Sequence, residues 1–239
     1  MKHTRFRIRN SAEREVSIEL NRLTLGGILT VPEGAKGIVL FAHGSGSSRF
    51  SPRNRFVAQH LQSYCVGTLL FDLLTPEEEA IDNETLQLRF DIPLLSERLI
   101  GATRWIMRNP VTAGQSIGYF GASTGAAAAL IAAARLGNTI SAVVSRGGRP
   151  DLAGEALGRV HAPTLLIVGG DDEQVITLNR QAFAQLGCRE KKLIIVPGAT
   201  HLFEEPGALE DVAGIATDWF ASRFEAAGQV GIRHASLAR

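Results

Sequence analysis

The sequence has few of the residues that mark several classes of protein. Only two cysteines, Cys65 and Cys188, occur in 239 residues, too few for a disulfide framework, so both are expected to be buried, reduced thiols. Basic and acidic residues nearly balance, 25 against 24, without the basic excess of a nucleic-acid-binding protein. No apolar run reaches the roughly 20 residues that span a bilayer, and the N-terminus lacks the apolar stretch of a signal peptide. These absences indicate a cytoplasmic protein that binds neither nucleic acid nor membrane.

The composition is that of a globular protein. Hydrophobic residues make up 45% of the chain and charged residues 21%, and a chain of this length can bury a sizeable core. Because neither an internal repeat nor a linker occurs, we expect a single domain over residues 1–239. The end of the chain, residues 228–239, lacks an apolar period and is expected to form a mobile tail. The acidic segment 74–88 is expected to be a solvated surface loop.

The order of the predicted elements indicates an α/β architecture. Alternation of polar and apolar residues on either side of Asn21-Arg22 predicts an antiparallel hairpin over residues 14–31. Short apolar runs rich in β-branched residues predict parallel strands at 37–44, 66–73, 116–123, 140–148, 163–172 and 191–198. Helical spacing predicts helices at 51–65, 96–110, 124–137, 177–187 and 210–228. We therefore expect a mainly parallel, doubly wound sheet of about eight strands, with the hairpin added at its start.

A serine stands between two glycines where a predicted strand turns into a predicted helix. Gly121-Ala122-Ser123-Thr124-Gly125 fits the pattern G-x-S-x-G, in the strand–turn–helix context that a nucleophile requires. Such a turn holds its serine in an unfavourable backbone conformation, and Cβ atoms at Gly121 or Gly125 would collide with neighbouring backbone. The alternative is a glycine-rich turn with an incidental serine, which binds a phosphate at the helix N-terminus.

A serine nucleophile needs a base, and the base needs an acid that fixes its tautomer. Asp171 and Asp172 follow the next strand but one, and His201 follows the last strand. Both positions lie at the carboxyl ends of parallel strands, where the crevice of an open α/β sheet lies. His43 is the best rival to His201 as the base, but it precedes the serine in the sequence. The other histidines are expected to be packed, exposed or terminal.

The segment Phe41–Ser48, FAHGSGSS, is expected to supply half of an oxyanion hole. Acyl-transfer intermediates carry a negative oxygen, which two backbone N–H groups can stabilise. The amide of Thr124, which follows the nucleophile, is one expected donor, and the amide of Ser45 is the other. The alternative is a flexible turn that needs Gly44 and Gly46 only for its geometry. The loop lacks the Gly-Lys-Ser/Thr of a P-loop.

With HGSGSS, GASTG, GGDD and GATH each behind its strand, the chain resembles the α/β hydrolase superfamily, and within it the dienelactone hydrolase-like branch. The resemblance extends from about Val16 to Ala226. The spacing G-x-x-D-x-x-V in that family favours Asp172 over Asp171 as the acid. The resemblance implies a hydrolase of esters, lactones or thioesters without metal or organic cofactor. Dienelactone hydrolases themselves have a cysteine nucleophile, so the lactone substrate is not carried over. Residues 148–163 leave room for one short helix and for no inserted lid domain.

The substrate is expected to be a small molecule, and the protein a monomer or homodimer. Arg53 and Arg146 are expected to border the site, where guanidinium groups would suit a carboxylate or phosphate on the substrate. Alternatively, the arginines of these segments pair with surface carboxylates such as Asp72 or Asp151. Three other functions remain open on the same residues: a peptidase, a cofactor-free perhydrolase, and a non-catalytic binding module or receptor.

Overall fold

Eight strands form one sheet in the order β1-β2-β4-β3-β5-β6-β7-β8. The structure, a computed structural model, describes residues 12–237 and the side chains of residues 12–225. The pairs β1–β2 and β2–β4 are antiparallel and the other pairs are parallel, so the predicted sheet and its hairpin are confirmed. The strands are β1 (Arg14–Leu20), β2 (Leu23–Thr30), β3 (Gly37–Ala42), β4 (Gly67–Phe71), β5 (Ser116–Ala122), β6 (Ile140–Arg146), β7 (Thr164–Gly169) and β8 (Lys191–Val196).

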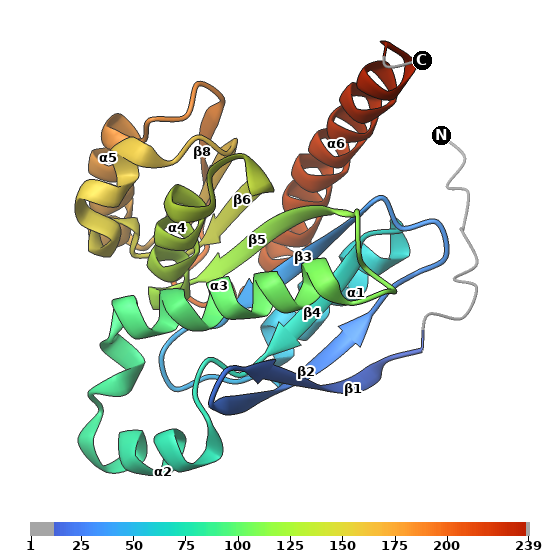
Figure 1. The fold of residues 1–239 in the computed structure, drawn as a ribbon. Coiled ribbons are helices and arrows are strands. Elements are labelled where there is room, and N and C mark those ends of the chain that lie inside the picture. Colours follow the sequence, from blue (N-terminus) through green and yellow to red (C-terminus); the bar gives the residue numbers. More distant parts are fainter. Residues whose placement is uncertain (1–11, 238–239) are drawn as a thin grey trace.

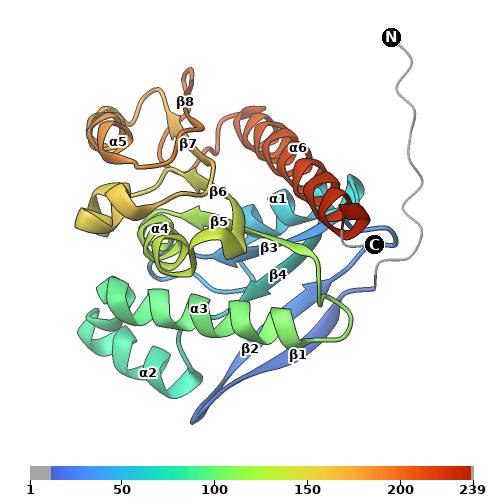
Figure 2. The same ribbon diagram turned by 45° about the horizontal axis from the view of Figure 1, so that its top comes forward.

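Helices cover both faces of the sheet. They are α1 (Pro52–Ser63), α2 (Pro76–Thr85), α3 (Ile92–Arg108), α4 (Thr124–Leu136), α5 (Glu173–Gln185) and α6 (Ala208–Leu237), with short 3-10 segments η1 (Leu88–Phe90), η2 (Gly137–Thr139) and η3 (Pro150–Arg159). Helices α3 and α4 lie on one face, and α1 and α6 lie on the other (Figure 1). The turned view shows α3 and α4 side by side in front of the sheet (Figure 2).

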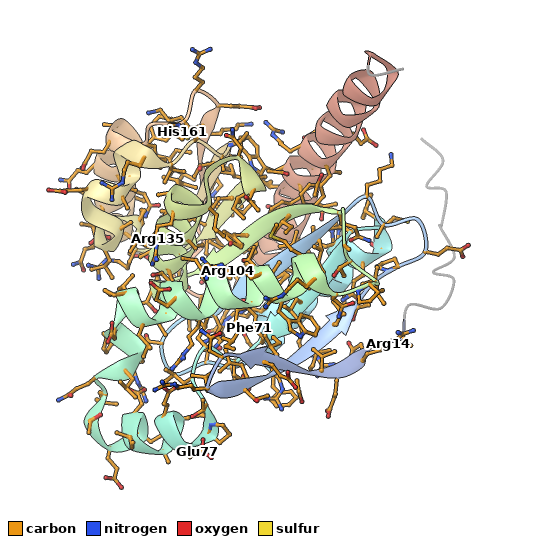
Figure 3. The ribbon with its side chains drawn as sticks, viewed as in Figure 1. Arg14, Phe71, Glu77, Arg104, Arg135 and His161 are labelled. Carbon is orange, nitrogen blue, oxygen red and sulfur yellow. The ribbon has the colours of Figure 1, made fainter. Side chains whose placement is uncertain are left out.

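The central strands are buried because helices cover them on both sides. Every residue of β3 and of β4 is buried, as the continuous apolar runs predict. Phe71 at the end of β4 lies beneath α3 (Figure 3), in a core that includes Leu95 and Leu99 of that helix. Burial of each such side chain contributes about 1.5–3 kcal/mol relative to exposure. Apolar cores on both faces of the sheet therefore hold the strands in place. The carboxyl ends of the parallel strands meet at one edge.

The acidic segment 74–88 contains a helix, so the prediction of a loop is wrong. Thr75 forms a capping box with Glu78: the Thr75 hydroxyl accepts from the Glu78 amide, and the Glu78 carboxylate accepts from the Thr75 amide. Pro76 stands in the first turn, and acidic residues there interact favourably with the helix dipole. Figure 3 shows Glu77 at the outer edge of the molecule, on α2. The cap and the first-turn charges outweigh the low hydrophobicity on which the prediction was based.

One further segment is more regular than expected, and one expectation about a single residue is wrong. Helix α6 continues to Leu237, through most of the expected tail, because no proline interrupts it and glycine costs a helix only about 1 kcal/mol. Residues 238–239 of that tail lie outside the described residues. Cys188 is buried as expected, but Cys65 is exposed because it lies in the turn after α1, with φ +57°.

The connection between β6 and β7 contains only η3, so the prediction that no lid domain is inserted there is confirmed. Among the helices that the structure describes, none is both long enough and apolar enough to cross a membrane.

Candidate active site

Ser123 occupies a strained turn between β5 and α4. Its backbone has φ +50° and ψ −122°, a conformation that non-glycine residues rarely adopt and that costs about 1–3 kcal/mol. Neighbouring backbone holds it there: the Ser123 amide donates to the carbonyl of Arg146 at 3.3 Å, and the Arg149 amide donates to the carbonyl of Ser123 at 3.0 Å. The end of β6 and the loop after it therefore hold the serine in this conformation, with its side chain partly exposed at the edge of the sheet.

The two glycines of the turn are required by close contacts. A methyl group at Gly121 would lie 2.8 Å from the backbone nitrogen of Ala126, and one at Gly125 would lie 2.5 Å from the carbonyl oxygen of His43. Real Cβ atoms essentially never approach this closely. The collisions expected from the sequence are therefore present, because α4 begins directly against the end of β5 at Gly121 and against the end of β3 at Gly125.

Asp172 and His201 are in direct contact. His201 Nδ1 lies 2.7 Å from Asp172 Oδ2. Because a carboxylate only accepts hydrogen bonds, the imidazole proton resides on Nδ1, and Nε2 keeps a lone pair that can take a proton. Asp171 makes no such contact; its side chain is exposed and its amide donates to the carbonyl of Ala199 at 3.0 Å. Of the two aspartates that the sequence left open, the structure brings Asp172 to the histidine.

The loops that carry these two residues are tied together at the ends of β7 and β8. The Gly170 amide donates to the carbonyl of Val196 at 2.7 Å. A methyl group at Gly169 would lie 2.5 Å from the carbonyl oxygen of Thr200, so only glycine lets the two loops approach this closely. Since β7 and β8 are adjacent parallel strands, their following loops meet beyond the same edge of the sheet.

His201 lies beside the end of β6, the strand that also holds the Ser123 turn. A methyl group at Gly147, which has φ +51°, would lie 3.0 Å from the His201 carbonyl oxygen and 3.6 Å from its ring atom Cε1. Within residues 12–225, no hydrogen bond joins Ser123 Oγ to His201 Nε2; such bonds often form only once a substrate is bound. The role of Gly147 was not predicted; the sequence signal for this glycine is the pair Gly147-Gly148 after β6.

The loop after β3 lies against Ser123, and His43 fixes its path. A methyl group at Gly44 would lie 3.0 Å from Ser123 Cβ. The Leu73 amide donates to His43 Nε2 at 3.1 Å, so the ring proton resides on Nδ1, which donates to the Gly44 carbonyl at 2.9 Å. Burial lowers the pKa of His43, against the opposing effect of Asp72 and Glu79. Both ring nitrogens are occupied, so His43 is neutral and unsuited to be the base.

The structure also brings together the two residues whose amides are expected to form the oxyanion hole, Ser45 and Thr124. The Ser45 amide donates to Thr124 Oγ1 at 3.0 Å, between the loop after β3 and the first residue of α4. A cleft adjoins this loop on the side of α2, and its lining includes Ser45, Glu79 and Arg89. The sequence signal for α2 is the capping box at Thr75 and Glu78. The missed helix therefore borders the loop that carries Ser45.

The predicted substrate arginines lie on the α1 side of the sheet. Arg146, at the end of β6, is only 6% exposed; its guanidinium donates to Asn54 Oδ1 at 3.4 Å and lies 5.9 Å from the Phe203 ring. Burial, followed by the nearby Arg53, lowers the pKa of Arg146 to about 10. Arg53 pairs with Glu204 at 3.1 Å.

Other arginines of the same segments form the alternative ion pairs that the sequence suggested. Arg49 pairs with Asp72, and Arg149 pairs with Asp151 at 2.8 Å.

The remaining described histidines lie elsewhere. His60 on α1 contacts Thr217 Oγ1 at 2.9 Å, and Figure 3 shows His161 at the end of the molecule opposite α2. Among the described residues, no group of three or more histidine, cysteine or acidic side chains is arranged to hold a metal ion.

Comparisons with known proteins identify the family. No family model matches the chain. A solved dienelactone hydrolase from Anabaena variabilis is 59% identical, with a TM-score of 0.88, over 89% of this chain and 98% of that one. The chain belongs to the dienelactone hydrolase-like α/β hydrolases. The chain shares its fold with Est1E from Butyrivibrio proteoclasticus, at 15% identity and a TM-score of 0.73, over 88% of this chain and 99% of that one. The same fold occurs in a dienelactone hydrolase-like promiscuous phosphotriesterase, P91, at 18% identity and a TM-score of 0.72, over 90% of this chain and 99% of that one.

The chain also matches part of a longer protein. A Mycobacterium tuberculosis protein named as a phosphoribosyl transferase is 55% identical over 219 residues, which are 92% of this chain and 48% of that protein. The chain thus spans about half the length of these curated relatives.

Proposed function

We propose that the hydrolase cleaves carboxylic esters, lactones or thioesters of a small substrate through an acyl-enzyme on Ser123. The observation that carries the proposal is the strained Ser123 on a strand-to-helix turn, at the same edge of the sheet as His201 paired with Asp172. Backbone strain at this partly exposed serine costs stability, and a position that costs stability is better explained by a function than by chance. A phosphate-binding turn would need neither the histidine nor its aspartate.

In the proposed reaction, His201 Nε2 takes the proton of Ser123 Oγ as that oxygen bonds to the substrate carbonyl carbon. The carbonyl oxygen becomes an oxyanion beside the N-terminus of α4. Asp172 keeps the imidazole in the reactive tautomer and stabilises its charge. When the carbonyl re-forms, the leaving group departs with the proton from His201, and water then releases the acyl group by the same steps.

The Mycobacterium tuberculosis relatives are named as phosphoribosyl transferases, and this name fits the proposal where it describes the half of those proteins that the chain does not match. The matched 219 residues contain the proposed acyl-transfer site, and 52% of those proteins lies outside the match. We propose that phosphoribosyl transfer is not an activity of this chain.

Labelling with a fluorophosphonate tests the function directly. The wild-type protein should be labelled on Ser123 and should hydrolyse p-nitrophenyl esters, and Ser123→Ala should lose the label and lower kcat by roughly 10⁴–10⁶-fold. Labelling that persists in Ser123→Ala would contradict the proposal. Absence of both labelling and hydrolysis in the wild type would favour a binding module, and cleavage of peptides over esters would favour a peptidase. Formation of peracids from hydrogen peroxide would favour a perhydrolase.

We further propose that the substrate carries an anionic group that Arg146 and Arg53 bind. Among the described residues, Arg146 has no carboxylate partner, and its Nε is buried without a hydrogen bond. Arg53 is nearby and pairs with Glu204, whose carboxylate balances one of the two charges. A buried cation held beside a second cation costs stability, and such perturbed groups cluster at functional sites.

A comparison of matched esters tests the charge preference. Arg146→Gln and Arg53→Gln should lower kcat/KM for esters with a carboxylate or phosphate on the acyl group more than for neutral esters with the same leaving group. Arg149→Gln is the matched control, since Arg149 already pairs with Asp151. Equal losses on anionic and neutral esters would contradict the proposal.

A further inference from the structure

The backbone amide of Ser45 is already hydrogen-bonded, and its direction is fixed. It donates to Thr124 Oγ1 at 3.0 Å. A trans peptide directs its N–H away from its C=O, and His43 Nδ1–H holds the C=O of the same peptide, that of Gly44. The buried, neutral ring of His43 therefore aims the Ser45 amide at the threonine. To bind an oxyanion itself, this amide would first have to leave the Thr124 hydroxyl.

The Thr124 hydroxyl still has a proton to donate. A hydroxyl carries one donor and two acceptor positions, and Thr124 Oγ1 uses one acceptor position for Ser45. In the part of the chain with described side chains, its proton has no acceptor. Thr124 is 4% exposed and directly follows Ser123 as the first residue of α4, where helical N–H groups have no partner within the helix. Two donors of one buried residue therefore lie next to the nucleophile.

We propose that the Thr124 hydroxyl is the second donor of the oxyanion hole, and that the Ser45 amide holds and polarises it. This inference rests on the proposed function. As Ser123 Oγ bonds to the carbonyl carbon, the π electron pair moves onto the carbonyl oxygen and the serine proton moves to His201. The N–H and O–H of Thr124 donate to that oxygen and keep their protons. Accepting a hydrogen bond from Ser45 strengthens the hydroxyl as a donor.

Two substitutions at Thr124 separate the hydroxyl from its methyl group. Thr124→Val keeps the shape and removes the hydroxyl, and on p-nitrophenyl acetate it should lower kcat by about 10²–10³-fold with KM unchanged. Thr124→Ser keeps the hydroxyl and should restore kcat. Thr177→Val is the matched control, because it removes the hydroxyl of an exposed helical threonine on α5. A trifluoromethyl ketone should lose affinity for Thr124→Val by the same factor as kcat/KM, since its hemiketal oxygen takes the oxyanion position.

An unchanged or higher kcat in Thr124→Val overturns the inference, because the released Ser45 amide would then be the donor. Equal losses in the valine and serine variants also overturn it, since any change of packing at position 124 would then lower kcat whether or not the hydroxyl is kept. If circular dichroism shows that the valine variant is unfolded, Thr124→Ala is compared with Thr124→Ser in the same way. A wild-type protein that hydrolyses no ester and takes no fluorophosphonate label removes the proposed function as well. A labelled wild type with an unaffected valine variant removes only the role of Thr124.

Discussion

Replacing Asp172 with asparagine should disable the proposed base while leaving the fold intact. The substitution keeps the size of the side chain at a position that is 15% exposed, and removes its charge at 2.7 Å from His201 Nδ1. The asparagine NH₂ can donate to Nδ1, which moves the imidazole proton to Nε2 and leaves no lone pair facing the serine. If its carbonyl faces the ring instead, the tautomer survives, but the charge that stabilises the imidazolium is lost.

The size of the effect follows from this geometry. Two unit charges about 4 Å apart interact by about 4 kcal/mol at the effective dielectric constant of a protein surface, or about 10³ in rate. The wrong tautomer adds to this loss, so we expect kcat for a p-nitrophenyl ester to fall by about 10³–10⁴-fold. Asp171→Asn is the matched control: it removes one negative charge from the adjacent residue, whose exposed side chain does not contact His201.

The assay is steady-state hydrolysis together with the rate of fluorophosphonate labelling, since both need the serine to be activated. Thermal melting checks that the two variants are as stable as the wild type. Loss of less than tenfold in Asp172→Asn would refute the assignment of the acid. An equal loss in Asp171→Asn would refute the argument from contact and leave only a general effect of charge.

Further predictions concern the stability of the fold. Gly121→Ala should destabilise by about 1–3 kcal/mol in urea unfolding, because its methyl group would lie 2.8 Å from a backbone nitrogen of α4, whereas Gly158→Ala meets nothing and should not. Burial lowers the pKa of His43 below 6.5, so its contribution to stability is complete above pH 6.5 and falls as the pH drops toward the folded-state pKa. Between about pH 7.5 and 5, the free energy of unfolding should therefore fall less steeply with decreasing pH in His43→Gln than in the wild type. Tyr119→Phe should cost about 1 kcal/mol, because it removes the 2.6 Å bond to Thr103, whose hydroxyl still bonds within α3; no change would contradict this.

The sheet was predictable because its signals are local. Continuous apolar runs mark strands that are covered on both faces, and the alternation around Asn21 marks the hairpin, where that residue adopts φ +46°. Segment 74–88 was misread because its acidic composition was weighed and its Thr75–Glu78 capping box was not. Cys65 was misread because a predicted helix says nothing about the burial of a turn residue just beyond its end.

The proposed catalytic residues were also predictable, since each follows a strand and parallel strands end at one edge. Sequence spacing favoured Asp172, but only the packed loops of β7 and β8 bring its carboxylate to His201. The pairing of the arginines was not predictable. Among the described side chains, Arg49 and Arg149 pair with carboxylates while Arg146 does not, and this depends on which residues the tertiary fold brings beside each arginine.

The contact between Ser45 and Thr124 illustrates why the finer chemistry of the site lies beyond sequence patterns. It joins residues 79 positions apart and exists because β3 and β5 are neighbours in register, with Ala42 opposite Gly121. A shift of one residue in this register would move Ser45 by about 3.3 Å along the strand, out of hydrogen-bond reach of the threonine. The same register seats Gly125 against the end of β3, where even a methyl group would collide. The glycines of the turn therefore do more than permit a strained serine: they set the distance at which the loop after β3 can reach Thr124.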